Sequence, residues 1–175
     1  MTNLQFDQFV PSEVCLKCDG CCRFKEPGTI WRPKMSDEEA VFVKTSGLAE
    51  KILSVDMLDD GQFIRTKPGC GEHLCRFFDP KDHTCAIYHA RPFECQLYPF
   101  VISRGENGTG LYVHLNCPHV QANQQKLYMR QYTLYLRNFL KRPEVHAFLT
   151  RNRNLLNDYS QYQNELEFVF LLEGI

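Results

Sequence analysis

Nine cysteines among 175 residues constrain this chain more than any other feature. An odd number cannot all pair as disulfides within one chain. Residues 1–11 contain no basic stretch followed by an apolar run, so we recognise no signal peptide and predict a cytoplasmic location. Because cytosolic thiols are kept reduced, this cysteine content favours metal ligation, and a disulfide scaffold is the alternative.

The strongest local pattern is the motif Cys15-x-x-Cys18-x-x-Cys21-Cys22. A Cys-x-x-Cys spacing brings two sulfurs to one metal, and Gly20 permits a tight turn before the third cysteine. Thiolates are soft ligands, which favour zinc or the iron of an iron–sulfur cluster over magnesium or calcium. The side chains of adjacent Cys21 and Cys22 diverge in most backbone states. They therefore serve two sites or different irons of a polynuclear centre, or one of them is a buried non-ligand.

The remaining cysteines are widely spaced, at Cys70, Cys75, Cys85, Cys95 and Cys117. Compact zinc fingers have their ligands in close pairs, so this spacing predicts ligands delivered by successive strands and loops to a shared site. An inert buried cysteine is the alternative for any one of them, above all for Cys70 and Cys117. Three histidines lie beside these cysteines and could replace a thiolate: His73, His83 and His89.

The sequence from Cys85 to Pro99 reads Cys-Ala-Ile-Tyr-His-Ala-Arg-Pro-Phe-Glu-Cys-Gln-Leu-Tyr-Pro, and Cys117-Pro118 follows it. Together with the N-terminal motif and Cys75, it resembles the CxxCxxCC cysteine-cluster family, the YkgJ-like zinc- or iron-chelating domain, over residues 15–118. The resemblance implies eight metal ligands and leaves Cys70 as the spare. These ligands are Cys15, Cys18, Cys21, Cys22, Cys75, Cys85, Cys95 and Cys117.

Aromatic and basic residues within this motif also have expected roles. Arg91 either stabilises the net negative charge of a thiolate site or forms an ordinary salt bridge. Tyr88, Phe93 and Tyr98 are expected to pack around the site and exclude water. The sequence offers no Ser–His–Asp order, phosphate loop or dinucleotide fingerprint, so no catalytic residue is identified.

We predict an α+β fold in a single domain, 1–175, with a cysteine-rich region at 15–118 and a mainly helical region at 119–175. Residues 1–35 are expected to be irregular and organised by metal. Ser36 and Glu39 form a capping box that begins a helix through about Lys44, ended by Gly47. Strands are predicted at 62–66, 74–78, 84–88, 100–103 and 111–115, with a hairpin loop at 105–110.

The C-terminal pattern predicts two helices. In the first, Leu127, Tyr128, Leu134, Tyr135 and Phe139 recur at helical spacing and form the expected buried stripe. Pro143 begins the second helix, whose buried face is Val145, Phe148 and Leu149. The apolar run 166–172 fits either a strand or a helix.

The formal net charge of −1 gives no attraction to nucleic acid or to an anionic membrane, and no apolar run is long enough to span a bilayer. We therefore expect a metal-binding or structural module whose helical part binds a protein partner. An iron–sulfur redox protein is one alternative. The resemblance gives a second, because the same superfamily includes flagellin lysine N-methylases.

Overall fold

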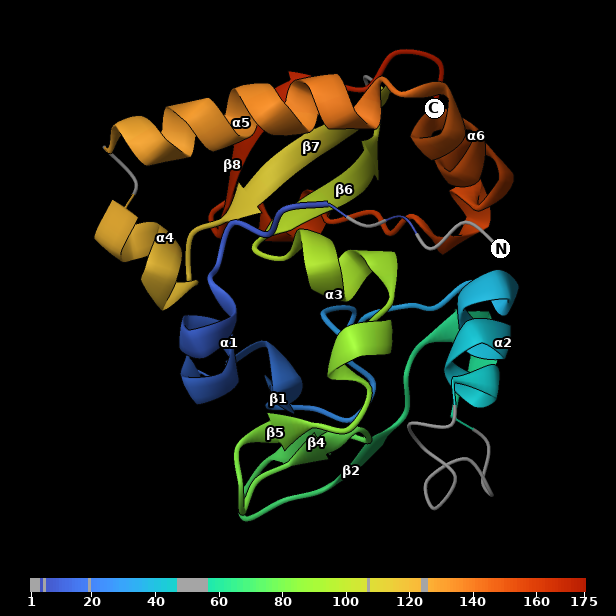
Figure 1. The fold of residues 1–175 in the computed structure, drawn as a ribbon, viewed down its shortest axis with the longest axis vertical. Coiled ribbons are helices and arrows are strands. Elements are labelled where there is room, and N and C mark those ends of the chain that lie inside the picture. Colours follow the sequence, from blue (N-terminus) through green and yellow to red (C-terminus); the bar gives the residue numbers. More distant parts are fainter. Residues whose placement is uncertain (1–3, 5, 19, 47–56, 107, 124–125) are drawn as a thin grey trace. The chain divides into compact units, whose positions relative to one another are not determined.

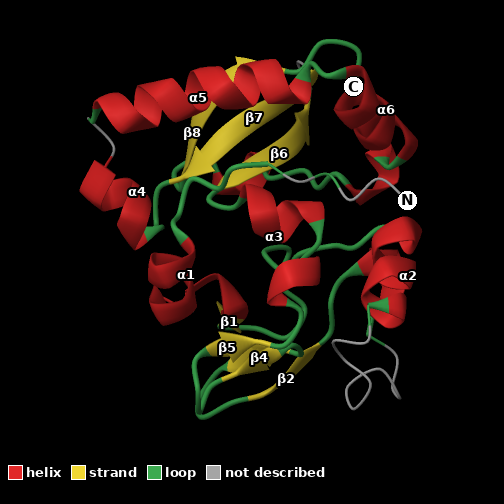
Figure 2. Ribbon diagram, in the orientation of Figure 1, coloured by secondary structure: helices red, strands yellow, loops and turns green. Residues whose placement is uncertain are grey.

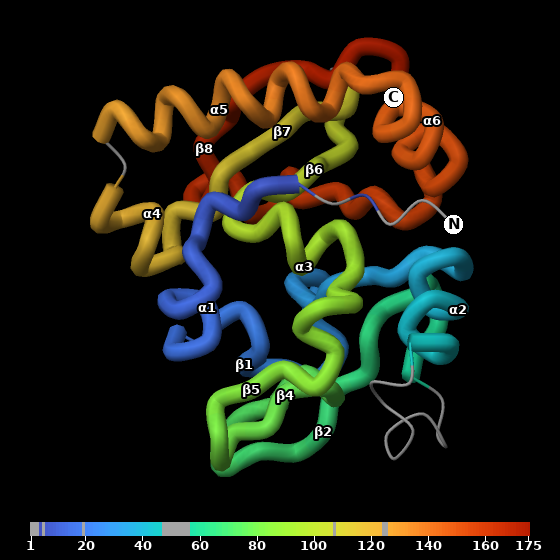
Figure 3. Tube along the Cα trace, in the orientation of Figure 1, coloured from blue at the N-terminus to red at the C-terminus, as the bar shows by residue number. Residues whose placement is uncertain are grey.

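The structure, a computed structural model, describes residues 4, 6–18, 20–46, 57–106, 108–123 and 126–175. Helices and short antiparallel sheets alternate along the chain, so the predicted α+β class is confirmed (Figures 1 and 2). Two compact units form: unit 1 is Pro11–Gln96, and unit 2 joins Leu4–Val10 to Leu97–Ile175. Figure 3 lets the chain be followed from unit 2 into unit 1 and back. The single domain over 1–175 stays a prediction.

Unit 1 consists of short elements. Its helices and strands are α1 (Ser12–Cys18), β1 (Arg23–Phe24), α2 (Asp37–Thr45), β2 (Thr66–Pro68), β3 (His73–Cys75), β4 (Phe78–Asp79), β5 (Thr84–Cys85) and α3 (Phe93–Leu97), whose last residue lies in unit 2. Single 3₁₀ turns occupy Gly20–Cys22, Asp60–Gln62 and Tyr88–Ala90. One sheet has the strand order β1-β3-β2, and a second pairs β4 with β5.

Helix α2 begins as the sequence predicts. The Ser36 hydroxyl accepts the Glu39 N–H at 3.2 Å, and the Glu39 carboxylate accepts the Ser36 N–H at 2.8 Å, which completes the capping box. The helix continues to Thr45, one residue beyond the predicted end. Gly47, the predicted stop, lies outside the described residues.

Unit 2 is built on a three-stranded antiparallel sheet in the order β6-β7-β8. Its elements are β6 (Phe100–Gly105), β7 (Gly108–His114), α4 (Pro118–Asn123), α5 (Leu127–Leu140), α6 (Pro143–Arg151), β8 (Leu166–Leu171) and the 3₁₀ turns Arg153–Leu155 and Ser160–Tyr162. The predicted hairpin is confirmed, but its strands extend to the pair Gly105–Gly108, so the loop is shorter than expected. The undecided run 166–172 is the strand β8, which pairs with β7.

Helix α5 shows where the helical pattern was misread. Leu127 and Leu134 are 68% and 60% exposed and Tyr128 is 40% exposed, so the predicted stripe is wrong there; Tyr135 is half-buried, and Phe139 is buried as predicted. The true buried face is Met129, Tyr132, Leu136, Phe139 and Leu140. The sequence contains two apolar stripes on this helix, and a periodicity alone does not say which one meets the sheet.

Helix α6 follows its prediction. Pro143 occupies the first turn, and Val145, Phe148 and Leu149 are buried. Within the described residues, no helix is both long and apolar enough to cross a membrane.

The corrected stripe on α5 gives a stability test. Leu136→Ala should lower the free energy of unfolding by about 2–5 kcal/mol, because Leu136 is 0% exposed and truncation leaves a cavity. Leu134→Ala is the matched control and should change it by less than about 0.5 kcal/mol, because Leu134 is mostly exposed. Urea unfolding followed by circular dichroism measures both, and equal effects would contradict the assigned faces.

Candidate metal centre

The first two cysteines of the N-terminal motif lie on a helix. The Pro11 carbonyl accepts the N–H groups of Val14 and Cys15 at 3.0 and 2.9 Å, which starts α1. Residues 12–18 are therefore helical, and the prediction of an irregular segment is wrong here. Cys15 and Cys18, three residues apart, share one side of this helix.

Cys21 and Cys22 follow in a 3₁₀ turn that leads into β1. Strand β1 pairs with β3 in the register Arg23–Leu74. Extending this antiparallel register by one residue places Cys22 opposite Cys75. The sheet thus brings a cysteine of the N-terminal motif beside one from the distant second group.

Cys75 and Cys85 each end a strand. The Phe77 N–H donates to the Cys75 sulfur, and the Ile87 N–H donates to the Cys85 sulfur. One more cross-strand hydrogen bond follows each cysteine, from the Arg76 N–H to the Arg65 carbonyl at 3.0 Å and from the Ala86 N–H to the Phe77 carbonyl at 2.9 Å. Predicted strands 74–78 and 84–88 were too long: β3 ends at Cys75, and β5 ends at Cys85. Hydrogen bonds of this kind stabilise thiolate ligands.

Cys95 lies on α3, and a carboxylate from α2 fixes the start of that helix. Glu39 accepts the Phe93 N–H at 2.6 Å as well as the Ser36 N–H of its own capping box. One side chain thus satisfies the free N–H groups at the beginning of two helices. This contact places α3, and with it Cys95, against α2.

Seven cysteines of unit 1 form what we call the thiol cluster: Cys15, Cys18, Cys21, Cys22, Cys75, Cys85 and Cys95. Burial is the main cause that raises the pKa of four of them, and the charge of Cys21 raises each further: Cys15, Cys75, Cys85 and Cys95. The pKa of Cys75 is raised to about 12. The Cys21 thiol is therefore close enough to influence sulfurs from both cysteine groups.

Cys22 shows the same crowding most strongly. Its hydrogen bond with Cys21 raises the pKa of Cys22 most, followed by burial and by the charges of Cys21, Cys75 and Cys95. Thiols packed in this way lose protons only where cations balance the resulting negative charge. A bound metal ion is such a cation.

Arg91 brings a fixed positive charge to the thiol cluster. Its side chain is buried, and Nη1 lies 3.7 Å from the Cys15 sulfur. Nε donates to the Tyr88 carbonyl at 2.9 Å, and the guanidinium lies over the Tyr88 ring, with Cζ 3.7 Å from its centre. Its charge lowers the pKa of Cys15, Cys85 and Cys95 against the larger effect of burial.

No carboxylate among the described residues forms an ion pair with Arg91. A buried guanidinium without an anion is costly, by several kcal/mol. The thiols of Cys15, Cys85 and Cys95 are the groups placed to supply that negative charge. Of the two roles predicted for Arg91, this geometry favours stabilisation of thiolates over an ordinary salt bridge.

Two carboxylates hold the Cys95 helix to other segments: Glu94 within the helix and Glu39 on α2. Glu94 accepts the Lys34 N–H at 2.7 Å. Burial raises its pKa to about 7; the Lys34 N–H and charge lower it, and the charge of Glu39 raises it. Burial also raises the pKa of Glu39. Both carboxylates connect segments far apart in the sequence, so no local pattern predicts their role.

The other predicted site residues are scattered. Cys70 is exposed in the turn between β2 and β3, and Cys117 is buried in unit 2 before α4. His73 lies in β3, and exposed His83 and His89 contact the rings of Phe78 and Tyr88. The eight-ligand set, with Cys70 as spare, stays a prediction.

The residues expected to pack around the site differ in their contacts. Phe93 is buried in α3 of unit 1, and Tyr88 holds Arg91 as described. Tyr98 belongs to unit 2, where its hydroxyl lies 3.0 Å from Nδ1 of His114. Sequence reasoning missed the carboxylates Glu39 and Glu94, of which only the capping role of Glu39 has a local signal.

The thiol cluster fits zinc or iron in the chemistry of its donors. Soft sulfur ligands are gathered, two receive N–H···S hydrogen bonds, and Arg91 balances negative charge. In the described parts of the chain, however, no three His, Cys, Asp or Glu side chains already stand where they could hold one metal ion. The sulfurs are therefore assembled but not closed around a common point.

A family model described as "CxxCxxCC: Putative zinc- or iron-chelating domain" matches residues 14–133. Neither the curated proteins nor the solved structures gave a match. The matched region contains every cysteine of the thiol cluster, together with Cys70, Cys117 and Arg91.

The raised pKa of Glu94 predicts a pH-dependent stability. Between about pH 4.5, the ordinary value, and about pH 7, the folded chain holds a proton that the unfolded chain has released. The free energy of unfolding should therefore be highest below pH 4.5 and fall by up to about 3 kcal/mol as pH rises to 7. Glu94→Gln should remove most of this slope.

The check is urea unfolding of metal-free protein at several pH values. Glu26→Gln, which alters an exposed carboxylate of unit 1, is the control and should keep the wild-type slope. A Glu94→Gln protein whose stability falls with pH as steeply as the wild type would contradict the assignment.

Proposed function

Because the chain belongs to the CxxCxxCC family of zinc- or iron-chelating domains, we propose that its thiol cluster binds the metal and that metal binding holds unit 1 together. The observation that carries this proposal is Arg91, a buried guanidinium beside Cys15 with no carboxylate partner among the described residues. Its charge needs an anion, and metal-bound thiolates remain anionic. The chain then acts as a metal-binding structural module.

The packing of unit 1 supports a structural role for the metal. Cys75 belongs to the hydrophobic core of this unit, and Cys22 and Cys85 pack against that core. If these side chains turn toward a common metal, the packing of the core of unit 1 changes with them. Metal binding and folding are coupled in sites of this kind.

The position of Cys21 favours one shared centre over two separate sites. Its charge affects cysteines from α1, β3, β5 and α3. A sulfur near so many others suits a polynuclear centre, and this observation favours an iron–sulfur redox protein as the second candidate. Cys117 stays a predicted eighth ligand, described with unit 2.

The proposal also includes the kind of partner that the module binds and the compartment in which it acts. The net charge of −1 supports a protein partner rather than nucleic acid or a membrane surface. The high content of reduced cysteine suits a cytoplasmic location.

Metal and acid-labile sulfide analysis, with an absorption spectrum, tests the proposal on protein purified without oxygen. About four irons with four sulfides per chain would identify an iron–sulfur protein. About one or two zinc ions without sulfide would identify a colourless thiolate site. Cys21→Ser should lose most of the metal, and exposed Cys70→Ser should keep it. Wild-type protein without either metal, or equal metal in both variants, would overturn the proposal.

Arg91 has its own prediction. Arg91→Met should weaken metal binding by about 10- to 100-fold, because the charge that balances the thiolates is lost. Arg91→Lys keeps the charge but loses the planar contact with Tyr88, so it should fall between Met and wild type. Competition with a chromophoric chelator measures the affinities. Arg65→Met, at an exposed arginine of the same unit, is the control, and an equal loss there would refute a specific role for Arg91.

A further inference from the structure

The N-terminal segment Leu4–Val10 lies within unit 2, although the next residue of the chain begins unit 1. The described residues of this segment belong to no helix or strand. In Figure 1 the dark-blue trace runs past β6 on the side of α5. The segment is therefore held by side chains of unit 2 rather than by a strand ladder.

One side chain of the segment fills an aromatic pocket. Phe9 is 0% exposed. Its ring stacks on Tyr128 at 5.2 Å, and the rings of Phe100, His119 and Tyr132 surround it at 5.6, 5.1 and 5.2 Å between centroids. A second ring, Phe6, lies 4.7 Å from that of Phe139, also on α5. Two aromatic side chains three residues apart thus anchor the segment.

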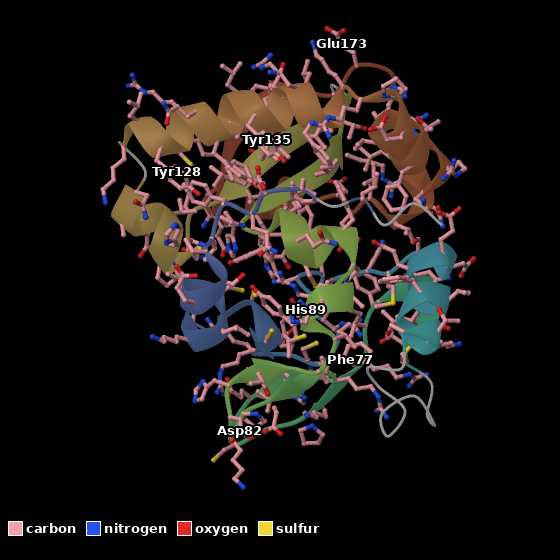
Figure 4. All side chains as sticks on the ribbon, in the orientation of Figure 1. Phe77, Asp82, His89, Tyr128, Tyr135 and Glu173 are labelled. Carbon is pink, nitrogen blue, oxygen red and sulfur yellow. The ribbon has the colours of Figure 1, made fainter. Side chains whose placement is uncertain are left out.

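Three tyrosine hydroxyls of α5 bind the main chain of the segment. Tyr128 donates to the Phe9 carbonyl at 2.9 Å, and Tyr132 donates to the Asp7 carbonyl at 2.6 Å. Tyr135 accepts the Asp7 N–H at 2.9 Å. The tyrosines lie at positions i, i+4 and i+7, so they share one helix face, and Figure 4 shows two of them on α5.

Contacts of this type recognise an extended peptide in general. Main-chain hydrogen bonds give affinity without regard to sequence, and pockets for alternate side chains give specificity. Because the partners are side-chain hydroxyls rather than a sheet, water can replace them when the segment leaves. We call the aromatic pocket of Phe9 and the tyrosine face of α5 together the groove; another peptide of the same pattern could make the same contacts there.

We propose that this face of α5 is a docking site for an extended peptide of a partner protein, with aromatic side chains three residues apart. The chain's own Leu4–Val10 fills the groove in the free protein and competes with the partner. The partner residue that matches Asp7 must have an N–H, because Tyr135 accepts it, so proline is excluded there. This site lies in unit 2 and does not depend on the proposed metal function.

Fluorescence anisotropy with a labelled peptide of sequence Leu-Gln-Phe-Asp-Gln-Phe-Val-Pro tests the proposal on the full chain. Binding to wild type should be weak, because the tethered segment acts at an effective concentration of about millimolar. Phe9→Ala in the chain weakens this competitor and should raise peptide affinity at least about 10-fold. Adding Tyr132→Phe to that variant should reduce the gain, because the hydroxyl that donates to the peptide main chain is lost.

Two control peptides test the pattern. One replaces its second phenylalanine with alanine, and the other replaces its aspartate with proline; both should bind at least about 10-fold more weakly. The proposal is overturned if the Phe9→Ala chain, still folded by circular dichroism, binds no better than wild type, or if the proline peptide binds equally well. Concentration-dependent dimers of the chain alone would assign the groove to a second copy and also overturn it.

Hydrogen exchange tests the proposal on the wild-type chain. It needs no variant, so its outcome does not depend on whether a variant folds. The Asp7 amide, held by Tyr135, should exchange through local opening, at least about 10-fold faster than the Leu136 amide inside α5. Equal protection of the two amides would mean that the segment leaves only on global unfolding. That result would overturn the proposal.

Discussion

The guanidinium of Arg91 sits among sulfurs instead of carboxylates, and much of unit 1 follows from that contact. Its Nη1 approaches the Cys15 sulfur on α1, while its charge reaches Cys85 and Cys95. Stacking on Tyr88 and donation to the Tyr88 carbonyl fix its direction. A charge that is buried and oriented in this way requires negative partners, and three separate elements supply thiols to meet it.

Two of the cysteines stand where short strands of unit 1 end. Strands β3 and β5 end at Cys75 and Cys85, and the backbone N–H two residues later donates to each sulfur. A regular strand would point that N–H at a neighbouring strand instead. The backbone thus donates to sulfur just beyond the end of each strand, and Cys75 itself belongs to the core of this unit.

Local sequence signals predicted local structure well. The capping box at Ser36, the proline that opens α6 and the β6–β7 hairpin each depend on neighbouring residues, and each is confirmed. The resemblance carried by the cysteine spacing identified the family. Predictions failed where burial depends on residues that are distant in the sequence. Helix α5 has two apolar stripes, and only the sheet that it covers determines which stripe is buried. Likewise, the contact of Glu39 with Phe93 joins residues 54 positions apart.

The two units rely on different ways of satisfying buried polar groups. In unit 2, tyrosine hydroxyls hold the main chain of an irregular segment, and these bonds are complete without any added group. In unit 1, thiols are crowded so that burial and neighbouring charge raise their pKa, which leaves Arg91 without a matching anion at neutral pH. Neutral thiols leave this imbalance in place, whereas thiolates bound to a metal remove it. Unit 1 is therefore the part of the chain in which we propose that metal-bound thiolates supply the anion that Arg91 lacks.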